Sequence, residues 1–321
     1  MSTFLGTTGN DTVTATAGTI NDSLFGDLGD DTLAGLGGAD TLNGGGGTDT
    51  VTYAASGAGV TVTLGAVGVG GDALGDTFIS IENVIGSNSA DALTGDGGNN
   101  ALYGGLGNDS LYGGLGNDTL AGGLNNDRIE GGAGIDTVSF ASATSGVVLT
   151  LLAGAGNSTG GDGSDTILGV ENIIGGIYAD TLTGDATDNV IAGGAGADSL
   201  AGGTGIDTVD YKASAVAVTV NLSAGTGLGG DAEGDLLSGF EIVQGSDFAD
   251  SLTGDTGDNT LIGGLGADTL DGGTGVDTVD YSGSAAAILV SLRAGLTSGG
   301  DAQGDRLFGI QNLIGSGFND T

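Results

Sequence analysis

The chain has 321 residues, with 73 Gly and no Pro, Cys or His, and its formal net charge is −37. The missing Cys and His exclude disulfides, Cys-ligated zinc, iron–sulfur clusters and histidine-dependent catalysis. Four basic residues cannot assemble a surface for nucleic acid or for an anionic membrane.

The apolar residues indicate a folded chain without a membrane span. They make up 38% of the residues and recur at fixed positions, which excludes a disordered linker. The absence of Pro and of a Gly-x-y period excludes a collagen-like chain. No apolar stretch approaches the roughly 20 residues of a membrane span, and the first residues lack the basic region of a Sec-type signal peptide.

Nine-residue units of the form Gly-Gly-x-Gly-x-Asp-x-(Leu/Ile/Val)-x dominate the chain from its first block onward. There are nineteen; the sixth residue is Asp in sixteen and Asn in three, and the eighth is always Leu, Ile or Val. Such strict phase is typical of a structural repeat. In chain order we predict block 1 at 1–52, a spacer at 53–85, block 2 at 86–139, a spacer at 140–174, block 3 at 175–210, a spacer at 211–244, block 4 at 245–280, a spacer at 281–314 and the start of a fifth block at 315–321.

The four spacers resemble one another and predict β-strands. Each begins at an aromatic residue, namely Tyr53, Phe140, Tyr211 or Tyr281. Apolar alternation follows, as in residues 216–222, and is typical of a half-buried strand. A Gly-Gly-Asp loop and a second apolar strand come next. Because the chain stops inside a unit, we expect part of a longer array or an incomplete gene product.

The Asp residues of successive units are expected to stack. If two units complete one coil, residues 18 apart lie about 4.8 Å from one another, so that Asp31 faces Asp49 and Asp109 faces Asp127. Stacked carboxylates repel by about 1 kcal/mol per pair even in water. Gly at positions one, two and four permits positive φ and lets carbonyl oxygens converge. Calcium accepts about six to eight such oxygens, whereas magnesium demands a tighter octahedron, so the pattern favours calcium.

These units resemble the RTX, or haemolysin-type, calcium-binding nonapeptide repeat. The resemblance implies an all-β fold, a parallel β-roll or β-solenoid of Gly-Asp-rich repeats with β-strand spacers, and calcium ions between successive turns. It implies metal-binding carboxylates at the sixth position: Asp11, Asp22, Asp31, Asp40, Asp49, Asp91, Asp109, Asp118, Asp127, Asp136, Asp180, Asp198, Asp207, Asp250, Asp268 and Asp277.

Three departures from the repeat leave alternatives open. Less is expected of five Asp residues whose units lack Gly at position four: Asp22, Asp91, Asp127, Asp180 and Asp250. Metal binding is also open in the three units with Asn at position six, which are those of Asn100, Asn189 and Asn259. The carboxylates of the Gly-Gly-Asp loops either bind further calcium or only shape a turn; they are Asp72, Asp162, Asp231 and Asp301.

The expected function is calcium binding by a non-catalytic β-roll that folds on calcium binding. No catalytic residue stands out from the repeat. The family resemblance implies a secreted protein, extracellular or at the cell surface, exported by type I secretion machinery. Two alternatives remain: the repeat region of a larger secreted enzyme of the protease, lipase or alginate-epimerase type, or a segment that binds polysaccharide or builds a surface layer or adhesin.

Overall fold

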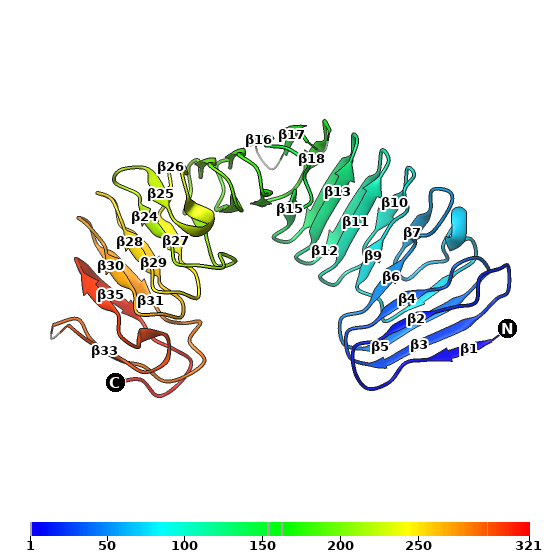
Figure 1. Cartoon of the computed structure of the whole chain (residues 1–321), viewed down its shortest axis with the longest axis horizontal. Coiled ribbons are helices and arrows are strands. Elements are labelled where there is room, and N and C mark those ends of the chain that lie inside the picture. Colours follow the sequence, from blue (N-terminus) through cyan, green and yellow to red (C-terminus); the bar gives the residue numbers. More distant parts are fainter. Residues whose placement is uncertain (1, 153–154, 162, 294) are drawn as a thin grey trace. The chain divides into compact units, whose positions relative to one another are not determined.

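The computed structural model describes residues 2–152, 155–161, 163–293 and 295–321, and these residues form β-strands and three single turns of 3-10 helix. The chain divides into two compact units, Met1–Ser142 with Gly154–Val170, and Ala143–Ala153 with Glu171–Thr321. Figure 1 shows the strands of each unit stacked as successive coils. The expected all-β parallel roll is confirmed.

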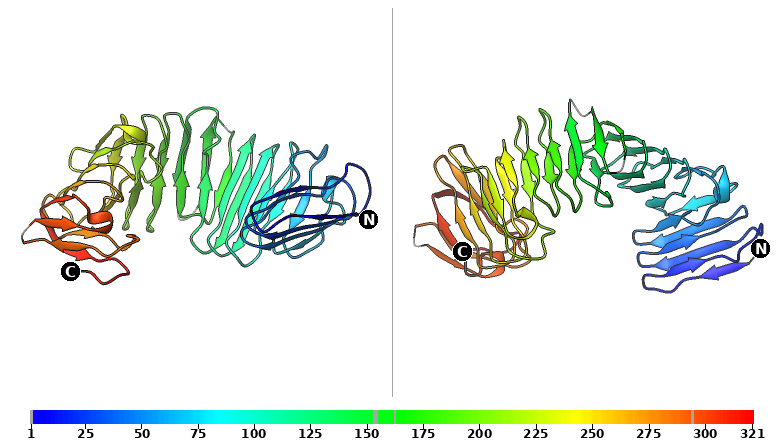
Figure 2. Two further views of the ribbon diagram at one scale, coloured as in Figure 1. Left: turned by 60° about the horizontal axis from the view of Figure 1, so that its bottom comes forward. Right: turned by 45° about the horizontal axis from the view of Figure 1, so that its top comes forward.

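In the first unit, consecutive coils are 18 residues apart within block 2, whereas the first two coils of block 1 are 20 residues apart. Strand β11 (Ala101–Leu106) pairs in parallel with β13 (Thr119–Leu124), and β12 (Ser110–Leu115) pairs with β14 (Arg128–Ala133). Leu102 lies beside Leu120, and Leu111 beside Ile129. The register confirms that two nonapeptides make one coil. Figure 2 shows these neighbouring strands from two further directions.

Three rows of parallel strands make up the first unit. Their orders are β1-β3-β5-β8, β7-β10-β12-β14-β18, and β2-β4-β6-β9-β11-β13-β15. The bounds are β1 (Thr3–Leu5), β2 (Thr12–Thr14), β3 (Ser23–Leu28), β4 (Thr32–Ala34), β5 (Thr41–Gly46), β6 (Thr50–Thr52), β7 (Thr61–Thr63), η1 (Gly71–Ala73), β8 (Thr77–Ile79), β9 (Asn83–Ile85), β10 (Ala92–Thr94), β15 (Thr137–Ser139), β17 (Ala155–Gly160) and β18 (Thr166–Leu168).

The second unit repeats the plan. Its parallel rows are β16-β20-β22-β26, β24-β28-β30-β34 and β19-β21-β23-β27-β29-β31-β35. The bounds are β16 (Val147–Leu151), β19 (Asn172–Ile174), β20 (Thr181–Thr183), β21 (Val190–Ala192), β22 (Ser199–Ala201), β23 (Thr208–Asp210), β24 (Thr219–Asn221), β25 (Thr226–Leu228), η2 (Gly230–Ala232), β26 (Leu236–Ser238), β27 (Ile242–Gln244), β28 (Ser251–Thr253), β29 (Thr260–Ile262), β30 (Thr269–Asp271), β31 (Asp277–Asp280), β32 (Leu289–Ser291), β33 (Leu296–Ser298), η3 (Gly300–Ala302), β34 (Arg306–Phe308) and β35 (Ile310–Ile314).

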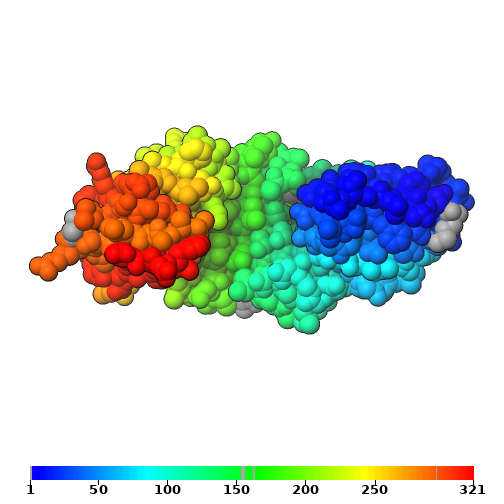
Figure 3. All heavy atoms as spheres, turned by 90° about the horizontal axis from the view of Figure 1, so that it is seen from below, coloured from blue at the N-terminus to red at the C-terminus, as the bar shows by residue number. Residues whose placement is uncertain are grey.

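The eighth residue of each nonapeptide forms the core. Leu33, Val51, Leu102 and Leu120 stack along one row of strands and are fully buried. Each contributes roughly 1.5–3 kcal/mol by burial of an aliphatic side chain. Figure 3 shows the coils of the first unit packed against one another in chain order, from dark blue to cyan. The column predicted from the sequence is therefore the core of the roll.

The spacers join two blocks by exchanging strands. In the first spacer, β7 pairs with β10 of the following block, whereas the later strand β8 pairs with β5 of the preceding block. The third spacer does the same: β24 pairs with β28, β26 pairs with β22, and antiparallel β25 lies between them. The alternating pattern predicted these strands but not their exchange.

Three of the Gly-Gly-Asp loops are tight turns built on 3-10 helix. The backbone N–H groups of Asp72, Asp231 and Asp301 donate to the hydroxyls of Ser56, Ser214 and Ser284, over 3.0–3.1 Å. These bonds are made by the backbone of the three Asp residues, and Oδ1 of Asp301 also accepts the hydroxyl of Ser284 over 3.1 Å. Asp162, the fourth residue of this set, lies outside the described residues.

Candidate metal centres

The sixth-position Asp residues form buried columns. In the second block the Oδ1 atom of Asp127 accepts the backbone N–H of Asp109 over 2.8 Å, and that of Asp136 accepts the N–H of Asp118 over 2.8 Å. In the first block Asp49 accepts from Asp31 in the same way. Each Asp precedes a strand, so the parallel ladder fixes its carboxylate against the next coil. The stacking expected from the 18-residue spacing is confirmed.

The second carboxylate oxygen, Oδ2, differs from the first. Within the described part of the chain, this buried atom has no hydrogen-bond partner in Asp22, Asp31, Asp40, Asp49, Asp109, Asp118, Asp198, Asp207, Asp268 and Asp277. We call the nonapeptides of these ten residues, together with those of Asp127 and Asp136, which share the burial and the Oδ1 bond, the regular units. A buried carboxylate without compensation costs several kcal/mol, so this oxygen is suited to bind a cation.

The first residue of a regular unit, which is Gly except for Ala17 in the unit of Asp22, lies beside Oδ2. A Cβ on Gly26 would overlap both Oδ2 of Asp31 and the carbonyl oxygen of Gly44 in the next coil. A Cβ on Gly104 would overlap Oδ2 of Asp109 and the carbonyl oxygen of Gly122. A carboxylate oxygen and a carbonyl oxygen from adjacent coils therefore face the same point.

Positive φ is not the reason for Gly at position one. Gly26 and Gly104 do not adopt it, whereas Gly105 at position two has φ 107° and Gly107 at position four has φ 125°. The expectation that all three glycines share one conformational role is therefore wrong for the first, which is required by space. The left-handed conformation belongs to positions two and four.

This set of oxygens fits calcium. Among the described residues, no cluster of three or more His, Cys, Asp or Glu side chains surrounds one point. A site here must combine single carboxylates with backbone carbonyls, and calcium accepts that mixture with variable geometry. Zinc, which takes His and Cys ligands, does not fit this donor set.

The comparison with known families agrees with this geometry. The family model for the RTX calcium-binding nonapeptide repeat matches residues 3–19, 16–51, 80–111, 103–138, 174–209 and 244–279, which is more than half of the chain. The chain belongs to the RTX calcium-binding repeat family. It is therefore a calcium-binding, acidic β-roll protein. A search of the curated proteins gives no match. None of the helices in the described residues is long and apolar enough to span a membrane.

Burial raises the pKa of carboxylates in the regular RTX units. It raises the pKa of Asp109 to about 7, with the neighbouring charges of Asp127 and Asp91 adding to the effect. The pKa of Asp198 rises to about 7 and that of Asp268 to about 8, again chiefly through burial. The charged form of these groups is thus disfavoured until a cation compensates it.

Two of the five doubted RTX units are regular. Asp127 lies in a unit with Asn125 at position four, and Asn125 adopts φ 88°, a conformation that Asn tolerates better than most residues. Asp22 is buried and its Oδ2 has no hydrogen-bond partner among the described residues, although Ile20 stands at position four. A missing Gly at position four therefore does not by itself remove a unit from the regular set.

The other three doubted units differ from the regular ones. Oδ2 of Asp91 accepts the N–H of Ser87 over 2.6 Å, and Asp180 and Asp250 accept from Gly176 and Ser246 at the same position two. Asp11 belongs with them, because its Oδ2 accepts both the N–H and the hydroxyl of Thr7, although its unit keeps Gly9 at position four. These four carboxylates are already satisfied by their own turns.

The three Asn units are satisfied as well. Oδ1 of Asn100 accepts the position-two N–H of Asp96 over 2.8 Å, and Nδ2 donates to the carbonyl oxygen of Glu82 over 2.9 Å. Asn189 and Asn259 repeat both contacts with Asp185 and Glu171, and with Asp255 and Glu241. We call these three units and those of Asp11, Asp91, Asp180 and Asp250 the capped units.

Sequence reasoning missed the spacer residues that continue the two columns, of which Glu82, Glu241 and Gln311 continue one. Asp76, Asp165, Asp235 and Asp305 accept the backbone N–H groups of Asp40, Asp127, Asp198 and Asp268 on Oδ1, just as block residues do. The sequence of two spacers nevertheless contains the nonapeptide pattern around these Asp residues. Residues 160–168 match the nonapeptide at all its defined positions, and residues 230–238 keep Gly, Asp and an apolar residue at positions one, six and eight.

Proposed function

We propose that this RTX chain is a secreted, non-catalytic structural module whose β-roll folds when calcium binds outside the cell. The supporting observation is the row of buried Oδ2 atoms in the regular units. Carboxylate oxygens such as Oδ2 of Asp31 and Asp109, with carbonyl oxygens such as those of Gly44 and Gly122, would hold the ions. Bound calcium would supply positive charge to a chain of net charge −37.

Coupling of calcium to folding follows from the origin of each site. Oδ2 and the carbonyl come from different coils, so their approach exists only in the folded roll. A ligand that binds only the folded state stabilises it, and a site absent from the unfolded chain makes binding energy into folding energy. Without calcium, the repulsion between 41 acidic residues opposes the compact state.

The secreted location rests on the usual affinity of such sites. Extracellular calcium modules bind at about 10⁻⁴ to 10⁻³ M, a concentration reached outside cells rather than in the cytosol. A chain with sites in this range would remain unfolded during synthesis and would fold after export, as is typical of the family. Export by type I secretion machinery is part of this proposal.

Far-ultraviolet circular dichroism during a calcium titration tests the proposal. The full chain starts in chelator, and magnesium serves as the control ion. We expect a cooperative gain of β signal with calcium and little change with magnesium. A β signal that is already complete in chelator would overturn calcium-driven folding and leave the Asp columns as turns that need no metal.

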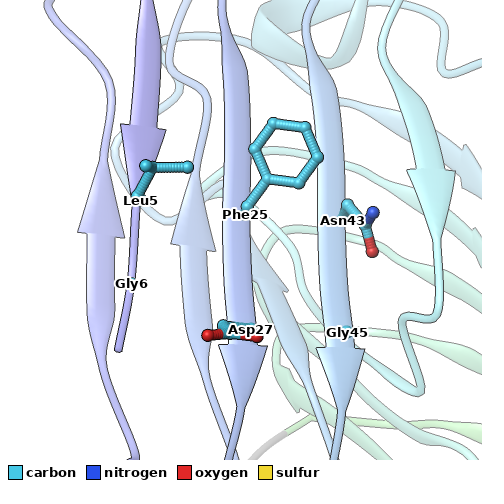
Figure 4. Close-up of a pocket in the computed structure, with 6 residues that line it drawn as sticks. All are labelled: Leu5, Gly6, Phe25, Asp27, Asn43 and Gly45. Carbon is cyan, nitrogen blue, oxygen red and sulfur yellow. The ribbon is translucent and has the colours of Figure 1, made fainter. Parts of the chain in front are cut away.

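A second candidate function, binding of a neutral polysaccharide, is favoured by a cavity of about 340 Å³ on the outer face of β1, β3 and β5. Figure 4 shows Phe25 between Leu5 and Asn43, with Asp27 further along β3. An aromatic face, an amide and a carboxylate offer both stacking and hydrogen bonds to a sugar ring. The acidic chain disfavours anionic glycans.

Glycan binding by the calcium-loaded chain tests this candidate. Replacement of Phe25 by Ala should weaken binding of a neutral oligosaccharide at least tenfold. Replacement of Tyr103, an exposed aromatic residue that is also at position nine of a unit, should leave it unchanged. Equal effects of the two substitutions, or no binding by the native chain, would remove the candidate.

A further inference from the structure

The spacer Asp residues extend one of the calcium columns, yet their second oxygens are bonded to hydroxyl groups. Oδ2 of Asp76 accepts the phenol O–H of Tyr53 over 2.8 Å. In the third spacer Tyr211 donates to Asp235 over 2.8 Å, and in the fourth Tyr281 donates to Asp305 over 2.7 Å. All three phenols are buried. The Oδ2 atom that has no hydrogen-bond partner in Asp40, Asp198 and Asp268, among the described residues, is thus bonded to a hydroxyl in these spacers.

The second spacer reaches the same result with different residues. Its aromatic residue is Phe140, which is buried but has no hydroxyl. Here the hydroxyl of Ser158 donates to Oδ2 of Asp165 over 2.6 Å. The four spacers therefore all place a hydroxyl on the column carboxylate, and the loss of the phenol in one of them is matched by a serine from another strand.

The turn beside the spacer carboxylate also differs from a regular turn. In a regular unit the first Gly lies against Oδ2, as Gly193 does with Asp198. In the spacers a Cβ on Gly230 or Gly300 would instead overlap the hydroxyl of Ser214 or Ser284. The corresponding Gly71 would meet the hydroxyl of Ser56 at 2.7 Å. In these three spacers a serine hydroxyl therefore lies where a regular unit has its facing carboxylate and carbonyl oxygens.

We propose that Tyr53, Tyr211, Tyr281 and Ser158 are specificity-determining residues that keep calcium out of the spacer coils, so that each block binds calcium as a separate group of sites. This inference rests on the proposed calcium function of the blocks. A hydroxyl bonded to a carboxylate is a short, charge-assisted contact, and it satisfies the oxygen that a cation would otherwise take. In the other column, the Nδ2 group of Asn100 donates to the backbone carbonyl oxygen of Glu82 and so occupies a carbonyl oxygen that a cation could bind.

Calcium stoichiometry at saturation, measured on the full chain by equilibrium dialysis with metal analysis, tests the proposal. Asp198 and Asp235 are neighbours in one column and share one hydrogen bond of 2.8 Å. Asp198→Asn should lower the number of bound ions by about one, whereas Asp235→Asn should leave it unchanged. An equal loss from both variants would overturn the proposal. A native chain that binds no calcium would instead overturn the proposed function.

A second pair of variants covers the case in which a column substitution prevents folding. Tyr211→Phe removes the hydroxyl from Asp235, and Tyr178→Phe is the matched control because Tyr178 is exposed. With calcium present, Tyr211→Phe should either bind one additional ion or lower the thermal midpoint, and Tyr178→Phe should do neither. If Tyr211→Phe changes neither quantity, the hydroxyl does not hold the place of a cation and the proposal fails.

Discussion

The first two nonapeptides of block 2 and the two that follow show the same motif in two states. In residues 86–103 the sixth-position side chains accept the position-two N–H groups of Ser87 and Asp96. In residues 104–121 the position-two residues are Gly105 and Gly114, with φ 107° and 116°, and Oδ2 of the Asp has no such bond. The local backbone decides whether the carboxylate is satisfied by the chain or left to a cation.

The residue at position two does not decide the state alone. Asp27 and Leu36 adopt positive φ in regular units, while Gly176 does not adopt it in a capped unit. Apart from Asp11, the capped units form the first coil after a spacer: the N–H of Val60 bonds to Asp91, and the carbonyl of Glu82 bonds to Asn100. The position directly after a spacer therefore separates the two states more consistently than residue type, because the last coil before a spacer is regular, as Asp40 is beside Asp76.

The largest effect on this comparison is expected from a side chain at position one of a regular unit. In Gly113→Ala the new Cβ would overlap Oδ2 of Asp118 and lie 2.5 Å from the carbonyl oxygen of Gly131. We expect a loss of about 2–4 kcal/mol in the free energy of unfolding, measured by urea unfolding in saturating calcium. Gly97→Ala in a capped unit is the control, because its nearest neighbour is 4.0 Å away. Similar losses in both would show that the space beside Oδ2 at position one is unimportant for stability.

Acid should partly replace calcium in the regular units. An Asp whose pKa is raised on folding binds more protons when folded, so its stabilisation is full below the unfolded value of about 4 and is lost as the pH rises through the folded value. With pKa values of about 7 for Asp109 and Asp198 and about 8 for Asp268, we expect more β structure in chelator at about pH 5.5 than at pH 8.5. Circular dichroism in chelator measures this. A signal that rises with pH would contradict the assignment.

A smaller effect should distinguish the carboxylates of the two states. Asp118→Asn removes a regular carboxylate and should raise the calcium midpoint for folding several-fold. Asp91→Asn removes one that already accepts from Ser87 and should change the midpoint less than twofold. Calcium titrations followed by circular dichroism give both midpoints. Equal shifts would show that regular and capped carboxylates contribute equally to calcium binding.

The smallest effect is expected from restoring Asp in a capped unit. Asn100→Asp loses the Nδ2 donor to the carbonyl of Glu82 and should cost about 1 kcal/mol in chelator. The control is Asn99→Asp, because Asn99 uses only its oxygen, as acceptor from the N–H of Asn117 over 2.8 Å. Urea unfolding of partly stabilised protein at low pH compares the two; no difference between them would show that the amide donor is dispensable.

The strict columns made most of the fold predictable from sequence. Eighth-position residues such as Leu102 had to face inward, and an 18-residue coil had to bring Asp31 to Asp49, because both follow from a fixed period. The strand exchange in the spacers was not predictable, since alternation in residues 216–222 reveals a strand but not its partner.

The sequence predicted where the candidate site residues lie, but not whether each unit is regular or capped. Sixth-position Asp residues look alike in sequence, yet Asp11, whose unit keeps Gly at positions one and four, is capped, and Asp127, whose unit has Asn125 at position four, is regular. The distinction depends on backbone angles at position two and on neighbouring coils. The Tyr53–Asp76 contact joins residues 23 apart in a spacer. The nonapeptide period does not extend through this segment, so the contact could not be predicted from it.

The exchange of strands in the spacers constrains how such a gene can grow. A recombination event inside a block adds or removes whole coils and leaves every spacer strand with its partner; block 2 has six nonapeptides where blocks 3 and 4 have four, a difference of one coil. A crossover between β7 and β8 would separate the strand that begins one block from the strand that completes the block before it. Duplication is therefore expected to be tolerated within blocks and selected against within spacers.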